Sequence, residues 1–168
     1  VMGWVRQQLP QIGQVRLVSA DFGFRAGYNR RSRLFAPELG GGALLDVGIY
    51  VLSFASMILG PRPVQLVSAA SFGESGVDEQ TSLLLSYADG AQATLTCAVR
   101  TTTPQEARII GTEGMIQIDS PFWRSTAATL RTGGGQVRAE FPLQGNGYNY
   151  EAAEVGRCLQ AGDKESRS

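Results

Sequence analysis

Residues 13–22 alternate apolar and polar side chains, with Val15 and Leu17 set against Gln14 and Arg16, which is typical of a half-exposed strand. The same period of two, rich in β-branched and aromatic residues, recurs through the second half of the chain between glycine-containing turns. It predicts seven further strands, over residues 64–72, 79–87, 91–100, 107–111, 114–118, 126–131 and 136–142.

Three stretches have the pattern of helices instead. Residues 1–9 resemble the last turns of an amphipathic helix that ends at Pro10, and residues 148–161 predict a helix capped by Gly162. Residues 43–59 are almost wholly apolar, which predicts a helix buried on most of its sides. This order of elements predicts an α+β fold: an open, predominantly antiparallel mixed sheet with helices on one face.

Residues 23–39 lack either period and contain glycine and proline, so we expect a long loop. It carries four arginines, Arg25, Arg30, Arg31 and Arg33. A loop of this length within a compact domain is more often functional than not. Because the chain opens inside a helix, we expect a piece of a larger protein: a helix remnant over 1–10, one domain over 11–162, and a tail over 163–168.

Composition excludes several classes of function. The 168 residues carry 15 basic and 15 acidic side chains, so the chain has no electrostatic footprint for nucleic acid or an anionic membrane. It has no histidine, which excludes Ser-His-Asp and Cys-His nucleophile systems and His-ligated zinc, and we expect no metal site. The longest uncharged run, residues 47–61, is too short to span a membrane, and no signal peptide opens the chain, so we expect a cytoplasmic protein. Cys97 and Cys158 lack CxxC spacing and are expected to be buried thiols.

Gly40, Gly41 and Gly42 do not form a dinucleotide fingerprint, because Leu45 stands where GxGxxG needs its third glycine. We interpret them as a close backbone approach at a helix N-terminus, where free N–H groups could face an anion or a ligand. A purely structural turn is the alternative.

Asp46 is the only charge in the apolar helix, and Tyr50 lies four residues later, so their side chains share a face and can meet. A lone carboxylate there is costly unless it is paired or faces a cavity. The tyrosine hydroxyl beside it could act as a general acid if a positive neighbour lowered its pKa. The alternative is a buried aspartate satisfied by backbone and a core tyrosine. Phe122 and Trp123 either line a pocket or plug the sheet edge.

The segment PELGGGALLDVGIY, residues 37–50, resembles the substrate-domain motif of the Gfo/Idh/MocA oxidoreductase family, and most of all its branch of dimeric dihydrodiol dehydrogenase-like members. Further matches follow in order along nearly the whole chain: GQVR from residue 13, GVDE from 76, GTEGMI from 111, FW from 122 and GYNYEAAEV from 147. The resemblance implies a GAPDH-like C-terminal domain of a two-domain enzyme. The N-terminal Rossmann domain, absent from this chain, would bind most of the NAD or NADP.

The resemblance also implies site roles. Asp46 and Tyr50 match the positions of the family's catalytic aspartate and its His-or-Tyr acid–base residue, and a lysine of the missing domain would lower the pKa of Tyr50. The remaining assignments are substrate binding by Arg33 and Trp123 and backbone contact with the cofactor by Gly41 and Gly42.

Two functions follow as hypotheses. The first is an NAD(P)-dependent oxidoreductase acting on a C–OH group of a sugar, cyclitol or trans-dihydrodiol, with Tyr50 moving the proton and Asp46 orienting it; the isolated chain would be inactive. The second is a non-catalytic dimerisation or binding module. Either way we expect a small-molecule ligand and a homodimer through the open sheet face, because the strands carry apolar residues on both alternations of the sequence. The residues concerned are Leu83, Leu84, Leu85, Ala93, Leu95, Cys97 and Val99.

Overall fold

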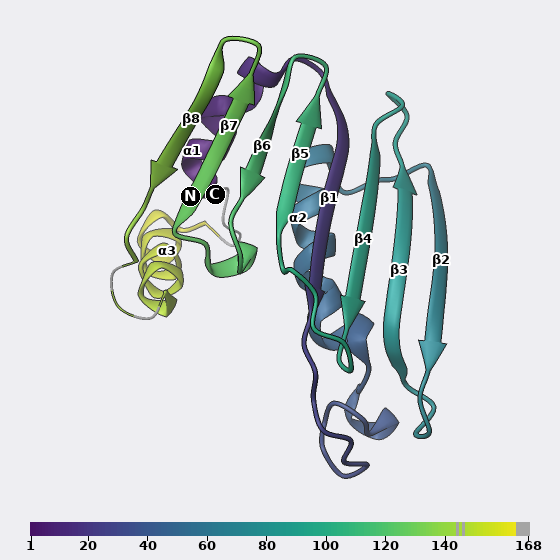
Figure 1. The fold of residues 1–168 in the computed structure, drawn as a ribbon. Coiled ribbons are helices and arrows are strands. Elements are labelled where there is room, and N and C mark those ends of the chain that lie inside the picture. The colour runs from purple at the N-terminus through teal and green to yellow at the C-terminus, as the bar shows by residue number, and fades with distance from the viewer. Residues whose placement is uncertain (144, 146, 164–168) are drawn as a thin grey trace.

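One eight-stranded sheet dominates the computed structural model, which describes residues 1–143, 145 and 147–163 (Figure 1). All but the first residue of the predicted tail therefore lie outside the described residues. The strands are β1 (Val15–Gly23), β2 (Gln65–Phe72), β3 (Asp78–Ser86), β4 (Gln92–Ala98), β5 (Ala107–Gly111), β6 (Gly114–Ile118), β7 (Ala127–Thr132) and β8 (Gly135–Glu140). The α-helices are α1 (Met2–Gln8), α2 (Ile49–Leu59) and α3 (Tyr148–Ala161). Short helical turns are η1 (Leu9–Ile12), η2 (Pro37–Leu39) and η4 (Phe122–Arg124), together with the π-helical turn η3 (Leu44–Gly48).

The strand order is β2-β3-β4-β1-β5-β6-β7-β8, so the first strand of the chain lies in the middle of the sheet. β1 runs parallel to β4, and every other neighbouring pair is antiparallel. In Figure 1, α1 and α2 lie behind the sheet, and the other face carries no helix. The predicted α+β fold with an open mixed sheet is confirmed, and Gly162 caps α3 in the left-handed conformation, as expected.

The two faces of the sheet differ sharply in chemistry. One row of paired residues, from β2 to β8, reads Ser68, Leu83, Leu95, Ala20, Ala107, Ile118, Ala128 and Ala139. The adjacent row on the opposite face reads Val67, Leu84, Thr94, Ser19, Arg108, Gln117, Thr129 and Arg138. From Leu83 to Ala128 the first row packs into the main core with α2, which includes Val18, Val51, Phe54, Leu95 and Ile109.

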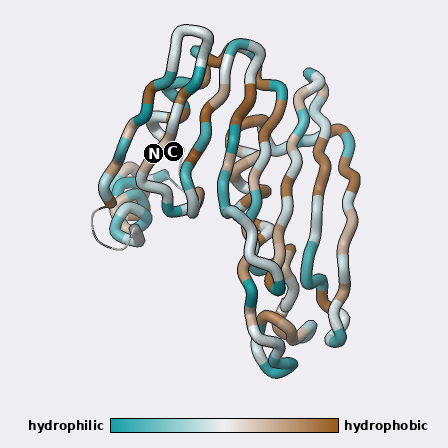
Figure 2. Tube along the Cα trace, in the orientation of Figure 1, coloured by the Kyte–Doolittle hydropathy of each residue, from teal (hydrophilic) through white to brown (hydrophobic). Residues whose placement is uncertain are grey.

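The expectation of apolar residues on both alternations holds for β3, where Leu84 lies on the open side, and is wrong for β4. Ala93, Leu95 and Cys97 all belong to the helix side of β4, whereas its open side carries Thr94 and Thr96. Apolar residues on the open face include Val67 and Leu84 toward the β2 edge and the paired Leu17, Ile110 and Met115 on β1, β5 and β6. Alternating polar and apolar positions are visible along several strands (Figure 2).

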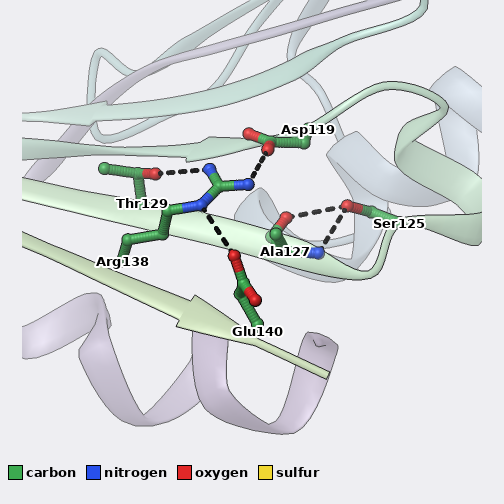
Figure 3. A network of polar contacts seen from close by, with 6 residues as sticks. All are labelled: Asp119, Ser125, Ala127, Thr129, Arg138 and Glu140. Atoms are coloured by element: carbon green, nitrogen blue, oxygen red, sulfur yellow. Dashed lines mark hydrogen bonds and ion pairs between the residues drawn. The ribbon is translucent and has the colours of Figure 1, made fainter. Parts of the chain in front are cut away.

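At the β8 end, the open face of the sheet carries a network of ion pairs and hydrogen bonds around Arg138 (Figure 3). The Arg138 guanidinium lies 2.7 Å from Asp119 Oδ2 and 3.4 Å from Glu140 Oε1, and it donates a hydrogen bond to Thr129 Oγ1. Thr129 is buried beneath it. This end of the face is consequently polar, with Arg138 paired to two carboxylates.

The apolar helix is less buried than its composition predicts. Leu45, Ile49 and Met57, at a spacing of four and eight residues, are 66%, 54% and 37% exposed, and they form a stripe that faces away from the sheet. The stretch Pro37–Leu59 also has the length and mean hydropathy (1.9) of a membrane span, a property it shares with core helices of globular domains. The buried face and the exposed face of this helix both carry apolar side chains, so the sequence pattern does not show which face is buried.

A second core lies at the end of the sheet, beneath the long loop. It consists of Phe35, Ala43, Val47, Val77, Cys97 and Val99. The loop is tied to β4 and the residues after it by backbone bonds from Phe24 and Ala26, and Arg100 donates to the Ala26 carbonyl at 2.6 Å. The long loop is thus a packed segment with its own interior. Cys97 and Cys158 are both buried, as expected.

Candidate active site

Asp46 lies within the π-helical turn η3 and is nearly buried, with 9% of its side chain exposed. Its carboxylate forms an ion pair with Arg33, whose side chain reaches it from the long loop and is 71% exposed. A buried carboxylate needs such a partner, because desolvation without one is costly. The sequence predicted that Asp46 contacts Tyr50 or, as the alternative, that backbone groups hydrogen-bond to it. The partner of Asp46 in the structure is Arg33.

Tyr50 follows in the first turn of α2 and is 44% exposed, so it is not a core tyrosine. Its ring packs edge-on against Phe22 at 5.2 Å and near Trp123 at 6.1 Å between ring centroids. Asp46 and Tyr50 do not hydrogen-bond to each other. The Asp46 carboxylate turns instead to Arg33, which reaches it from the long loop.

Trp123 stacks on Phe22 with ring centroids 3.5 Å apart and planes 7° from parallel. Phe122 beside it is buried and contacts Phe54 edge-on, so Phe122 anchors η4 in the main core while Trp123 reaches the surface. Both aromatics line a cavity, as one of the predicted alternatives has it, and Phe122 also packs into the main core.

Two adjoining cavities meet at Tyr50 and Trp123. One, of about 630 Å³, is also lined by Arg33, Asp46 and the exposed stripe of α2. The other, of about 1020 Å³, extends toward α3 and is lined by Arg124, Glu140, Phe141, Tyr148 and Glu151 among others. The structure thus brings together four of the predicted site residues, namely Arg33, Asp46, Tyr50 and Trp123. Gly41 and Gly42 line neither cavity.

The glycines are accounted for by packing within the chain. A Cβ on Gly41 would lie 2.9 Å from three carbonyl oxygens of the loop, and one on Gly42, whose φ is +117°, would meet Asp78 Oδ1 at 2.2 Å. The N–H groups of Gly40, Gly41 and Gly42 donate to Pro37, Ala36 and Leu34 carbonyls. Because these N–H groups are already bonded, the geometry favours the structural turn over an anion-binding one.

Sequence reasoning passed over two residues that the site depends on. The Phe22 ring stacks on the Trp123 indole. Phe22 follows Ala20 by two residues, so the alternation of β1 already indicated that its side chain lies on the helix side of the sheet. Asp78 accepts a hydrogen bond from Leu44 N–H at 2.9 Å, and no local pattern indicates that contact across 34 residues.

The site holds no candidate metal centre: the described part of the chain has no group of three or more His, Cys, Asp or Glu side chains that could bind an ion. Around the smaller cavity it offers the phenol hydroxyl of Tyr50, the ion-paired carboxylate of Asp46 and an apolar wall. This donor set suits proton transfer to or from an alcohol oxygen beside a flat apolar ring.

Comparison with known proteins gives consistent matches. The family described as GFO/IDH/MocA C-terminal domain matches residues 8–117. Trans-1,2-dihydrobenzene-1,2-diol dehydrogenases of Xenopus tropicalis and Danio rerio are 38% and 39% identical over 92% of this chain. The chain spans about half the length of these curated relatives, covering 48% of each.

Solved structures agree in fold. Aldose-aldose oxidoreductase from Caulobacter crescentus, complexed with glycerol, has a TM-score of 0.82 and 26% identity over 96% of this chain and 50% of its own. The 3-ketoreductase KijD10 from Actinomadura kijaniata, in complex with NADP and TDP-benzene, has a TM-score of 0.84 over 99% of this chain and 52% of its own. At 19% identity the latter shows the fold alone.

Proposed function

The chain belongs to the GFO/IDH/MocA family, and from that premise we propose that it is the substrate-binding and catalytic domain of an NAD(P)-dependent oxidoreductase. Its substrate class is an alcohol carbon of a sugar, cyclitol or trans-dihydrodiol. The relatives are named as diol dehydrogenases, and similar structures as sugar oxidoreductases, which supports this class. The nucleotide part of the cofactor is assigned to the other half of the full-length protein, and no cofactor contact is assigned to the N–H groups of Gly41 and Gly42.

The described residues fit the reacting end of such a cofactor. The stripe of Leu45 and Ile49 is exposed beside Tyr50, and an apolar wall of this kind suits a flat nicotinamide ring. When bound, the nicotinamide accepts or donates the hydride of the alcohol carbon. The chain's own residues hold the substrate and handle the hydroxyl proton.

Tyr50 is the group placed to move that proton. Its hydroxyl makes no hydrogen bond within the described residues, while its ring is held by Phe22 and Trp123, so the oxygen is available to a substrate hydroxyl. Asp46, fixed by Arg33, lines the same cavity. We assign Arg33 and Asp46 to the substrate's other hydroxyl groups, as donor and acceptor, in place of a direct contact between Asp46 and Tyr50.

This proposal rests on Tyr50, which is exposed at the junction of the two cavities with its ring packed against two aromatic rings. The substitution Tyr50→Phe tests whether its hydroxyl moves the proton. In the full-length protein, with trans-1,2-dihydrobenzene-1,2-diol and aldoses as probes and NAD⁺ or NADP⁺ as acceptor, turnover should fall by roughly 10²–10⁴-fold. KM should change far less, because phenylalanine keeps the packing against Phe22 and Trp123.

Tyr28→Phe is the matched control, because Tyr28 is similarly exposed (39%) and packs edge-on against an aromatic ring but lines neither cavity. It should leave turnover unchanged. Near-normal turnover in Tyr50→Phe would show that another group moves the proton. Inactivity of the unmodified full-length protein on every probe would favour the non-catalytic module instead.

The homodimer is also proposed, on a smaller basis than the sequence suggested. The open face has no helix over it, and its apolar residues near the β2 edge include the paired Val67 and Leu84. Val67 is 53% exposed, and Val137, on the helix-side alternation at the opposite edge, is 57% exposed. Light scattering at micromolar concentration should give a dimer mass, lost in Val67→Asp and kept in Val137→Asp. A monomer mass for the unmodified chain would contradict the proposal.

A further inference from the structure

A hydrogen-bonded cluster lies beneath the segment that carries Asp46. Asp78, the first residue of β3, accepts through Oδ2 both from Leu44 N–H at 2.9 Å and from the Thr81 hydroxyl at 2.6 Å. Thr81 is buried, and its carbonyl receives the thiol of Cys97 at 3.6 Å. The cluster links the first residue of η3 to the two strands beneath it.

The same carboxylate shapes the turn that leads into η3. Its Oδ1 occupies the place where a Cβ on Gly42 would stand, at 2.2 Å, so the backbone at Gly42 lies directly against Asp78. At the other end of η3, a Cβ on Gly48 would meet Cys97 Sγ at 3.2 Å. The π-helical turn is therefore seated on the sheet at both of its ends, by Asp78 and by Cys97.

A π turn is rare, and it persists where its surroundings fix it. The first N–H groups of any helix lack partners within the helix, so an outside acceptor decides which residue begins it. Asp78 supplies that acceptor at Leu44, and a carboxylate is favoured there because helix N-termini carry partial positive charge. Two residues later, Asp46 points to Arg33.

We propose that Asp78 is a positioning residue, whose hydrogen bond to Leu44 N–H keeps residues 44–48 in the π-helical register and so directs Asp46 to Arg33 and the cavity beside Tyr50. Its consequence for turnover rests on the proposed function; its consequence for geometry does not. Without this bond, residues 44–48 relax toward an α-helix, and the Asp46 carboxylate shifts away from Arg33.

The test uses three variants. Asp78→Ala removes the acceptor and leaves Leu44 N–H and the Thr81 hydroxyl without it. Asp78→Asn keeps one oxygen that can accept both bonds. Leu130→Ala, in the main core on β7 and away from the cluster, is a control for general destabilisation.

The first readout is structural and needs no activity. Crystal structures of the 168-residue variants should show the η3 register and the Arg33–Asp46 ion pair lost in Asp78→Ala and kept in Asp78→Asn and Leu130→Ala. If Asp78→Ala retains both, or if Asp78→Asn loses them, Asp78 does not set the register and the inference is overturned.

The second readout is kinetic, in the full-length protein. Asp78→Ala should lower turnover by about 10- to 100-fold, as displacement of a site group by an ångström does, while Asp78→Asn stays within about threefold. The effects of Arg33→Gln and Asp46→Asn on KM should be non-additive in the unmodified protein and additive in Asp78→Ala. If Leu130→Ala lowers turnover as much as Asp78→Ala, the effect is general and the positioning role fails. A full-length protein without oxidoreductase activity would refute the proposed function but leave the structural readout intact.

Discussion

The two hydrophobic cores differ in size and in what they hold. The main core lies between α2 and the helix side of the sheet and includes residues from most strands, such as Leu95 and Ile109. The second core, beneath the long loop, has Phe35 and Val47 at its centre and fastens the loop and η3 to the ends of β3 and β4. Arg33 belongs to this loop and Asp46 to η3, so the second core supports both members of the ion pair. Fold stability and site geometry are thus supported by separate sets of residues, and substitutions can tell them apart.

The largest expected effect in the second core comes from Phe35→Ala. Phe35 is fully buried, so its loss should lower the free energy of unfolding by about 3–5 kcal/mol, measured by urea denaturation. Because Phe35 is the loop's own anchor, limited trypsin treatment under native conditions should also cleave at Arg30 and Arg31 at least about tenfold faster.

Leu130→Ala supplies the contrast from the main core. It should lower the unfolding free energy by about 2–5 kcal/mol, but its tryptic cleavage should spread over the whole chain, without preference for the loop. Selective loop cleavage in Leu130→Ala, or none in Phe35→Ala, would show that the two cores act as one.

A smaller effect is expected at the turn into η3. Gly42→Ala adds a Cβ that clashes with Asp78, at a φ of +117°, and should cost about 1–3 kcal/mol of unfolding free energy. Gly60→Ala is the matched control, since Gly60 also has a positive φ, +90°, but nothing lies within 4 Å of its added Cβ. The difference between the two variants measures the Asp78 contact, and equal losses would mean that backbone strain explains both.

The smallest effect concerns alkaline pH. Burial and the nearby charge of Asp78 raise the pKa of the Cys97 thiol from 9.0 to about 11. Between these values the unfolded chain loses the proton before the folded one, so the unfolding free energy should fall as pH rises, by at most about 1.4 kcal/mol per pH unit from this group. Cys97→Ala should flatten the slope between pH 9 and 11, and Cys158→Ala should keep it. An unchanged slope in Cys97→Ala would assign the effect elsewhere.

Local patterns predicted the elements well. The alternation in β1 and in the seven later strands, and the glycine after α3, reflect backbone preferences that act over a few residues. The α+β class followed from their order. The sequence also placed the helix that carries Asp46 and Tyr50 on the side of the sheet opposite the open face, where the structure has it.

Contacts between distant residues escaped the sequence. Arg33 reaches Asp46 from a loop without periodicity, and Asp78 reaches Leu44 from another strand, so neither pairing has a local signal. The π-helical turn η3 had no signal in the sequence either, because the helical period assumes 100° per residue. On β4, apolar residues were counted without regard to alternation, which misjudged the open face.

The central place of β1 sets an order of events during synthesis. β1 is the first of these eight strands to be made, yet its neighbours β4 and β5 begin only at Gln92 and Ala107, so Val18 must wait for Ala93 and Ile109 to emerge. At roughly 5–20 residues per second, β1 and the apolar α2 spend several seconds on the ribosome without the sheet that covers them. Pairings this distant also slow the search for the native state. We therefore expect the nascent chain to depend on chaperones until about residue 111 has left the exit tunnel, and to gain protease resistance abruptly after that point.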